Sequence, residues 1–434
     1  MPSAAPPAAS PPPTASIAPS SLPQPLPSTH WPAVLAALAC GIAISVLVGK
    51  VPLALGALRA ELGLSLVQFG WVSSVLTTLA VLFALPVGLL AGRIGALRMV
   101  LAGLVLGAVG ALAALPVHGI GGLLASRLVE GAAFLMVAVA TPSLITAATA
   151  PAQRRLALSL WSTYMPLGVS VGLIGGAALI ARAGWRALWL LSAVGLLAAA
   201  LGLLLQRRHY AALRPAAGPS ADSLRQTLQV LRQPLPWLLP AAFGAWALQH
   251  FALIVWMPAF MREQRGLDSA SVAALTSLML LVNIPGGLLG GVLMSRGVPR
   301  GPLIAVTHTL TGLLGLLAAA DGLPDGLRYA ACLAMSMIGG LVPAAVFSSS
   351  AVLARTPAQV AAVQGLILQG SQFGQFIGTP LIAAVVASAG HWSAARLVTA
   401  SAAALGVLVG LCCHRLERRQ AAAAAAATAL ARAA

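Results

Sequence analysis

Charged residues of either sign are scarce in this chain of 434 residues. Only 8% of the residues are charged, whereas 59% are hydrophobic. A soluble domain carries about a quarter charged residues, so this composition cannot cover a surface that faces water. A helix that spans a bilayer needs about twenty apolar residues, because it must satisfy its backbone polar groups internally. The composition therefore predicts an all-α polytopic membrane protein.

Cysteine is also scarce, and the motifs of several enzyme classes are missing. The four cysteines fall within apolar runs, and their spacing matches neither a zinc site nor a secreted disulfide framework. No Gly-rich loop ends in Lys-Ser/Thr, which argues against direct ATP drive, and no His-Glu-x-x-His occurs. The eight acidic residues are too few to suggest a two-carboxylate site. We therefore expect no enzyme, no metal and no cofactor.

The positive charge that is present lies in short loops between apolar runs. A net charge of +17 can indicate nucleic-acid binding, but no basic segment is interleaved with aromatic residues that would stack on bases, so we expect no nucleic-acid partner. Arginines such as Arg93, Arg154 and Arg355 lie on the side of both termini, and acidic residues such as Glu61 and Asp268 lie on the other side. Because Lys and Arg mark cytoplasmic loops, both termini are predicted to be cytoplasmic.

Twelve apolar runs are divided six and six. The runs cover 31–58, 67–90, 99–116, 121–149, 156–180, 187–206, 236–261, 270–294, 302–320, 328–353, 359–388 and 393–413. Residues 1–30, rich in Pro, Ala and Ser, are expected to form a disordered tail. The rest divides into an N-terminal bundle (31–206), a basic cytoplasmic loop (207–235), a C-terminal bundle (236–413) and a basic, then Ala-rich tail (414–434).

Two phrases of the first half return in the second half. Pro86–Gly92 returns as Pro285–Gly291, and Ala183–Trp185 returns as Ala389–Trp392. Two six-helix halves related by an axis along the membrane normal are a known transporter design, with the substrate site between them at mid-depth. The repeats therefore favour a duplicated transporter.

The turn between the second and third runs carries a spaced set of glycines and arginines. Gly88, Arg93, Gly95 and Arg98 resemble the loop 2–3 signature of the major facilitator superfamily (MFS) of secondary transporters. The acidic position of that signature is Gly92 here. The resemblance therefore implies a cytoplasmic gate at this turn without its usual carboxylate.

Further fragments follow in the order that the family has them. Arg127–Gly131 resembles the helix-four motif, Gly168–Gly176 the glycine-rich helix-five motif without its proline, and Gly184–Arg186 a segment common before helix six. Gly49–Pro52 and Trp161–Pro166 look most like the cyanate/nitroimidazole-transporter-like branch. The resemblance covers residues 31–415. It implies the MFS fold of twelve transmembrane helices in two pseudo-symmetric six-helix bundles, alternating access and a place in a bacterial inner membrane.

Ionisable residues inside the runs are the first candidates for transport, because such a charge is costly unless it faces protein or a watery cavity. Arg127 and Glu130 lie three residues apart on one helix face. They form either a self-neutralising pair or an anion contact beside a titrating carboxylate. Lys50 either snorkels to the interface or lines the central cavity. With Lys50 and Arg127 as charge contacts the substrate would be anionic, and Glu130 is the candidate for proton coupling.

Polar and aromatic side chains follow helical spacing in other runs. An aromatic stripe is more often core packing than a ligand site, but an amide or imidazole inside a span needs a polar partner. We expect the following side chains to line the substrate cavity: Trp161, Tyr164, Trp246, Gln249, His250, Trp256, Asn283, Gln369 and Gln372. Glycines of the fifth run, such as Gly172 and Gly175, are expected to allow close helix packing.

These observations favour a secondary active transporter of a small polar or anionic solute, in contact with membrane lipid and coupled to protons. Two other hypotheses stay open. An aromatic cavity of low charge also suits multidrug-type efflux of hydrophobic compounds. A membrane receptor or assembly protein could keep the same fold without moving any solute.

Overall fold

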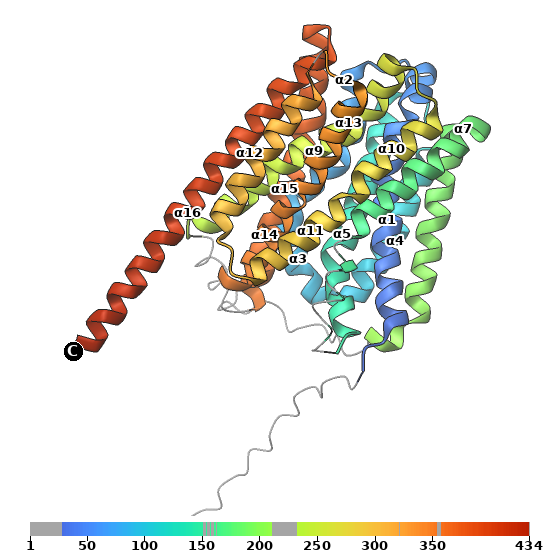
Figure 1. The fold of residues 1–434 in the computed structure, drawn as a ribbon. Helices are drawn as coiled ribbons and strands as arrows, with labels where there is room; N and C mark the ends of the chain where they lie inside the picture. Colours follow the sequence, from blue (N-terminus) through green and yellow to red (C-terminus); the bar gives the residue numbers. More distant parts are fainter. Residues whose placement is uncertain are drawn as a thin grey trace, which may run out of the picture.

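Helices make up the regular structure of the described chain. The computed structural model describes residues 28–150, 163–210, 232–320, 322–353 and 357–433, together with 153, 157, 160 and 161. Within these residues no strand occurs, and the helices run side by side in one bundle (Figure 1). Most of the predicted tail 1–30 and of the predicted loop 207–235 lies outside the described residues.

The first half of the bundle follows the order of the six predicted runs. Its elements are α1 (Trp31–Leu62), α2 (Leu66–Ser74), the 3-10 turn η1 (Val75–Thr77), α3 (Thr78–Ile94), α4 (Ala96–Ala113), α5 (Ile120–Ala147), α7 (Tyr164–Leu205) and η3 (Arg207–Tyr210). α2, η1 and α3 together form the second crossing, which is broken at η1.

The second half repeats this order. Its elements are α9 (Leu235–Arg265), α10 (Ser269–Leu281), α11 (Asn283–Ser295), α12 (Arg300–Ala318), α13 (Asp325–Gly339), α14 (Leu341–Leu353), α15 (Pro357–Ala389), η4 (Trp392–Ala394) and α16 (Ala395–Ala433). α10 and α11 form the eighth crossing, and α13 and α14 form the tenth.

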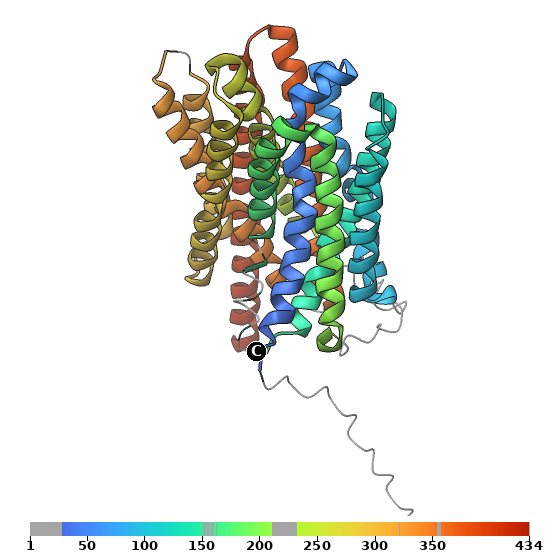
Figure 2. The ribbon, with the colours of Figure 1, turned by 90° about the vertical axis from the view of Figure 1, so that its right-hand side faces the viewer.

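α7 accounts for two of the predicted crossings. Eleven helical segments of the described chain are long and apolar enough to cross a membrane. A straight helix of the 42 residues of α7 would be about 63 Å long, about twice the thickness of the hydrocarbon core. At Gly184 φ is 73° and ψ is 173°, and the chain turns back there so that two limbs run in opposite directions (Figure 2). The eleven segments therefore make the twelve predicted crossings, and α1 begins at the end of the bundle where α16 finishes (Figure 1).

Backbone turns repeat at matching places in the two halves. Glycines with left-handed φ end α1 and α9, separate α3 from α4 and α11 from α12, and precede the sixth and twelfth crossings; the pairs are Gly63 and Gly266, Gly95 and Gly297, and Gly184 and Gly390. The members of these pairs are 203, 202 and 206 residues apart. The two halves are therefore pseudo-symmetric, as the repeated phrases predict.

The caps that follow two of these glycines repeat as well. Ser65 caps α2 in a capping box with Gln68, and Asp268 caps α10 by accepting hydrogen bonds from the amides of Ala270 and Ser271. The Asp268 carboxylate also accepts from the Ser271 hydroxyl at 2.6 Å. Because these bonds favour the charged form, the pKa of Asp268 lies below its ordinary value.

Small residues let neighbouring crossings approach closely in both halves. A Cβ on Gly172 of α7 would stand 2.9 Å from the carbonyl carbon of Gly49 in α1, and a Cβ on Gly374 of α15 would overlap the carbonyl of Gly244 in α9. Gly175 is different, because a Cβ there would meet open space. The packing role expected of the glycines in the fifth run is therefore confirmed for Gly172 but not for Gly175.

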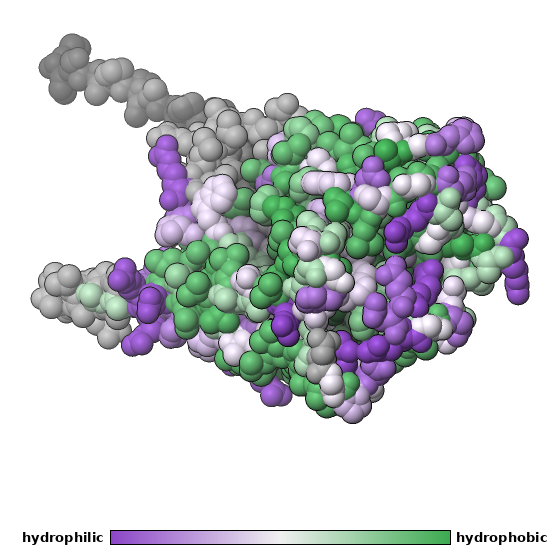
Figure 3. Space-filling model, turned by 90° about the horizontal axis from the view of Figure 1, so that it is seen from above, coloured by the Kyte–Doolittle hydropathy of each residue, from purple (hydrophilic) through white to green (hydrophobic). Residues whose placement is uncertain are grey.

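The flank of the bundle is apolar. The second limb of α7 exposes large side chains three or four residues apart, namely Leu190, Val194, Leu197, Leu201 and Leu205. Viewed from the end that is uppermost in Figure 1, hydrophilic residues gather over part of the end surface and hydrophobic residues extend to its edges (Figure 3). This distribution suits a protein whose sides face lipid and whose ends face water.

Candidate functional site

Three ionisable side chains meet inside the first half. The Lys50 Nζ atom of α1 lies 2.6 Å from Glu130 Oε1 of α5, and Arg127 Nη1 donates to Glu130 Oε2. All three side chains are at most 1% exposed. Lys50 therefore does not snorkel to the membrane surface, and it joins the pair that was predicted for Arg127 and Glu130. We call these three residues the charge cluster.

Arg127 also connects α5 to α1 and α2 through hydrogen bonds. Its Nη1 donates to the carbonyl of Leu47 at 2.8 Å and its Nε to the carbonyl of Val72 at 3.2 Å. Val72 lies just before α2 gives way to the 3-10 turn η1, where regular helical bonding is interrupted. Gly131 makes this approach feasible, because a Cβ there would overlap the carbonyl of Leu76. The spacing of Arg127 and Gly131 thus has a structural reason.

The charge cluster faces the interior of the first half. Lys50 Nζ lies 3.3 Å from the Ser192 hydroxyl and 4.3 Å from the centroid of the Trp189 ring, both on the second limb of α7. Gly110 of α4 packs against the Glu130 side chain. Two cations share one carboxylate, so the cluster carries a net positive charge in a region of low dielectric, where an unpaired charge is costly.

A second polar cluster lies inside the other half. The rings of Trp246 and His250 stack with centroids 4.7 Å apart. His250 Nε2 lies 2.9 Å from the Ser336 hydroxyl, and the Asn283 amide donates to the Ser336 carbonyl at 2.7 Å. His250 and Asn283 therefore converge on Ser336 of α13, and Trp246 stacks on His250.

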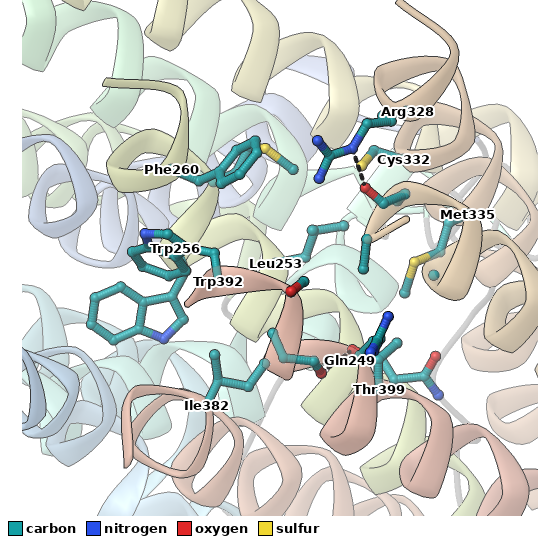
Figure 4. A pocket seen from close by; sticks show the side chains of 17 residues that line it. Gln249, Leu253, Trp256, Phe260, Arg328, Cys332, Met335, Ile382, Trp392 and Thr399 are labelled. Atoms are coloured by element: carbon teal, nitrogen blue, oxygen red, sulfur yellow. Dashed lines mark hydrogen bonds between the residues drawn. The ribbon is translucent and has the colours of Figure 1, made fainter. Parts of the chain in front are cut away.

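Gln249 and Trp256 lie on another side of α9. They line a cavity of about 110 Å³ between α9, α12, α13, α15, η4 and α16 (Figure 4). Gln249 is 1% exposed, and its Oε1 atom has no hydrogen-bond partner among the described residues.

The remaining predicted residues lie elsewhere. The rings of Trp161 and Tyr164 stack at 4.1 Å, and Trp161 packs against Gly41 of α1. Gln369 of α15 donates to the carbonyl of Val81 in α3 at 3.0 Å, which joins the two halves, and Gln372 is buried on the same helix. In this conformation the predicted cavity residues therefore form several separate groups.

Polar and aromatic side chains join the two halves near the end where α1 and α9 finish. Arg262 donates to the carbonyl of Leu53 at 3.3 Å, and Arg59 pairs with Glu263 at 3.7 Å. Aromatic contacts continue inward from there, with the ring centroids of Phe69 and Trp256 5.8 Å apart and those of Trp71 and Phe376 5.5 Å apart. Polar and aromatic contacts thus join the halves at this end.

Known proteins agree with this architecture. The family model described as Major Facilitator Superfamily matches residues 33–367.

The chain belongs to the major facilitator superfamily.

Two solved structures of a bacterial homologue of the human lysosomal transporter Spinster show the same fold as this MFS protein. The inward-facing, occupied form aligns with a TM-score of 0.67 at 14% identity, over 89% of this chain and 96% of that one. The inward-facing, unoccupied form aligns with a TM-score of 0.64 at 15% identity, over 87% and 95%. No curated protein matches the chain. Family and fold together make it a secondary transporter in the membrane.

The MFS signature turn is formed as a sharp reversal. Gly95, with φ of 92°, separates α3 from α4, and Arg98 at the start of α4 is exposed. Gly88 and Arg93 lie in α3, but their surroundings fall outside what the structure describes. The role of this turn in gating stays a prediction.

MFS proteins are typically not enzymes, and a hydrolase-like motif of the sequence lies within a helix. Gly168–Gly172 reads Gly-x-Ser-x-Gly, but a hydrolase places that serine on a strand-to-helix turn. Ser170 instead lies buried inside the first limb of α7. Among the described residues no group of three or more His, Cys, Asp or Glu could hold a metal ion.

Sequence reasoning missed the partners that complete these clusters. Ser192 and Trp189 border the charge cluster, and Ser336 joins His250 to Asn283. A single serine within an apolar run gives no local signal. Only the three-dimensional register of one crossing against another identifies it.

Proposed function

We propose that this MFS transporter moves a small polar or anionic solute by alternating access and couples it to protons through Glu130. The observation that supports the proposal is that one buried carboxylate pairs with two cations from two crossings. Protonation of that single group would remove the counter-charge of Lys50 and of Arg127 together.

The charge cluster can link proton binding to anion binding. Protonating Glu130 would leave two buried cations without a partner, and breaking a buried pair in this way costs about 3–5 kcal/mol. An anion that reached Lys50 and Arg127 would replace the lost counter-charge. Anion binding would then favour protonation of Glu130, and by reciprocity protonation would favour anion binding.

The other predicted cavity residues would serve the same solute. We assign hydrogen bonding to the amides and the imidazole, and wall contacts to the rings; the residues are Gln249, Gln369, Gln372, Asn283, His250, Trp161, Tyr164, Trp246 and Trp256. Because they form separate groups in this conformation, they would meet the solute at different stages as the two halves rock.

We also propose a bacterial inner membrane as the location, with both termini in the cytoplasm, and the cyanate/nitroimidazole-transporter-like branch as the subfamily. The orientation rests on the arginine-rich loops on the side of both termini. The subfamily rests on Gly49–Pro52 and Trp161–Pro166.

A ligand must be found before transport can be measured. A thermal-shift screen of the purified protein against small anions and common drugs identifies it, because a solute that binds only the folded state raises the unfolding temperature. The proposal expects stabilisation by small anions. Stabilisation by hydrophobic drugs alone would favour efflux instead.

The Glu130→Gln variant then tests proton coupling in proteoliposomes. We expect it to lose acceleration of solute uptake by a proton gradient. Glu263→Gln removes a half-exposed carboxylate outside the charge cluster and is the matched control, which should respond to the gradient as wild type does. Uptake by Glu130→Gln that stayed as proton-dependent as wild type would disprove this role.

A further inference from the structure

The cavity of the second half lies where the repeat places the charge cluster of the first half. Leu253 is 203 residues beyond Lys50, and Cys332 and Met335 are 205 residues beyond Arg127 and Glu130. The paired glycine turns are separated by 202 to 206 residues. All three counterparts, Leu253, Cys332 and Met335, line the cavity (Figure 4).

α4, which packs against the charge cluster, has its counterpart in α12. Gly110 packs against Glu130, and Gly315, which is 205 residues further on, has Met335 and Thr399 as its neighbours. Ala395 stands 206 residues beyond Trp189 and also lines the cavity. The cavity and the charge cluster therefore occupy pseudo-symmetric positions.

Smaller side chains at the corresponding positions explain why the second half has a cavity where the first half has the charge cluster. The first half fills the position with lysine, arginine, glutamate and an indole, whereas the second half has leucine, cysteine, methionine and alanine. The guanidinium and the indole are the largest losses. About 110 Å³ is left open.

The lining includes a buried amide, an aromatic wall and two arginines. Gln249 Oε1 is a buried acceptor with no partner among the described residues. Trp256, Phe260 and Trp392 form an aromatic wall. Arg328 and Arg396 belong to the lining near α13 and the start of α16. Arg328 is held by the Ala318 carbonyl at 2.9 Å, while Arg396 is exposed and has no hydrogen bond or ion pair among the described residues.

We propose that this cavity binds a small amphipathic carboxylate. Its apolar body would fill the space beside Leu253, Cys332 and Met335, its carboxylate would meet Arg396, and a donor on the ring would satisfy Gln249 Oε1. An engineered apolar cavity of about 150 Å³ binds benzene, and this cavity is smaller but partly open, so it holds at most one aromatic ring. The site lies within the second half and does not depend on the charge cluster.

Titration of the purified full-length protein with 4-hydroxybenzoate tests the site. Trp256 and Trp392 line the cavity, so their fluorescence reports occupancy, and calorimetry gives the dissociation constant. We expect saturable binding that is at least tenfold weaker for 4-hydroxybenzyl alcohol, which has the ring and the hydroxyl but no anion. Absence of binding to the folded wild type at millimolar concentrations would overturn the proposal.

Substitutions of lining residues test whether the ligand binds in the cavity. Cys332→Phe fills the cavity and should abolish binding, with Cys332→Leu as a milder filling variant if the first fails to fold. Arg396→Gln should weaken binding at least tenfold, whereas Arg98→Gln, an exposed arginine outside the cavity, should bind as wild type does. Glu263→Gln, which removes a half-exposed carboxylate outside both the cavity and the charge cluster, should also keep wild-type affinity. Wild-type affinity in both Cys332→Leu and Arg396→Gln would overturn the proposal.

Discussion

At the scale of residues, the charge cluster is asymmetric because one carboxylate serves two cations. Glu130 is the counter-ion of both Arg127 and Lys50, which is the only lysine of the sequence. Removing Lys50 leaves a neutral Arg127–Glu130 pair. Removing the charge of Glu130 leaves two buried cations and no anion.

This asymmetry predicts unequal losses of stability. Glu130→Gln should lower the free energy of unfolding by about 3–5 kcal/mol, the cost of leaving buried charge unpaired. Lys50→Met should cost clearly less. The double variant should be more stable than the sum of the two single losses predicts, because the pair interacts directly. Unfolding in mixed micelles measures all three, and equal losses from the two single variants would contradict the account.

The sequence indicates which residues matter at this scale but not which of them meet. Arg127 and Glu130 can be paired from their helical spacing. Lys50 is 80 residues away from Glu130, and their contact depends on how α1 is rotated against α5. The same holds for Gln249, which faces a cavity, and His250, which bonds to Ser336 although it is the next residue along α9.

At the scale of elements, long apolar runs predict the crossings well. The predicted run 121–149 corresponds to α5 at Ile120–Ala147. Composition does not reveal that the second and eighth crossings are each broken, nor that the predicted runs 156–180 and 187–206 meet at a single sharp turn at Gly184. Such features depend on local backbone turns and on packing between crossings.

Close packing of α1 on α7 gives a prediction with an internal control. Gly172→Ala should cost about 1–3 kcal/mol, because the added methyl group meets the backbone of Gly49 in a filled interface. Gly175→Ala adds the same methyl group three residues away in open space and should be neutral or slightly stabilising. Thermal unfolding of the two variants compares them directly. Equal effects of the two variants would show that packing against Gly49 does not set the cost.

The cap of α10 predicts a dependence on pH. The pKa of Asp268 is lowered by its bonds to Ser271 and Ala270, so its stabilising effect is present above the ordinary pKa of aspartate and is lost as the pH falls. The difference in unfolding temperature between wild type and Asp268→Asn should therefore shrink from neutral to acidic pH. A difference that grew on acidification would have the wrong sign.

At the scale of the whole molecule, the repeat gives two halves with similar backbones and different interiors. The first half fills its interior with the charge cluster, and the second leaves a cavity at the corresponding position. We infer that the first half carries the proton-linked chemistry. The second half provides the amides and the imidazole of the proposed substrate path, and both halves provide its aromatic rings.

The orientation in the membrane can be tested with single cysteines in a chain whose four natural cysteines are replaced. Arg418→Cys, beyond the predicted last run, should stay unlabelled by a membrane-impermeant thiol reagent on intact cells. Asp325→Cys, exposed at the start of α13, should be labelled. The reverse pattern would invert the predicted topology.

The most direct test of proton coupling through Glu130 compares two modes of transport in the same proteoliposomes. With the ligand identified by thermal shift, wild type should accumulate it under an inward proton gradient and should also exchange it across the membrane without a gradient. Glu130→Gln should exchange the ligand but no longer accumulate it. Accumulation by Glu130→Gln equal to that of wild type would contradict the account.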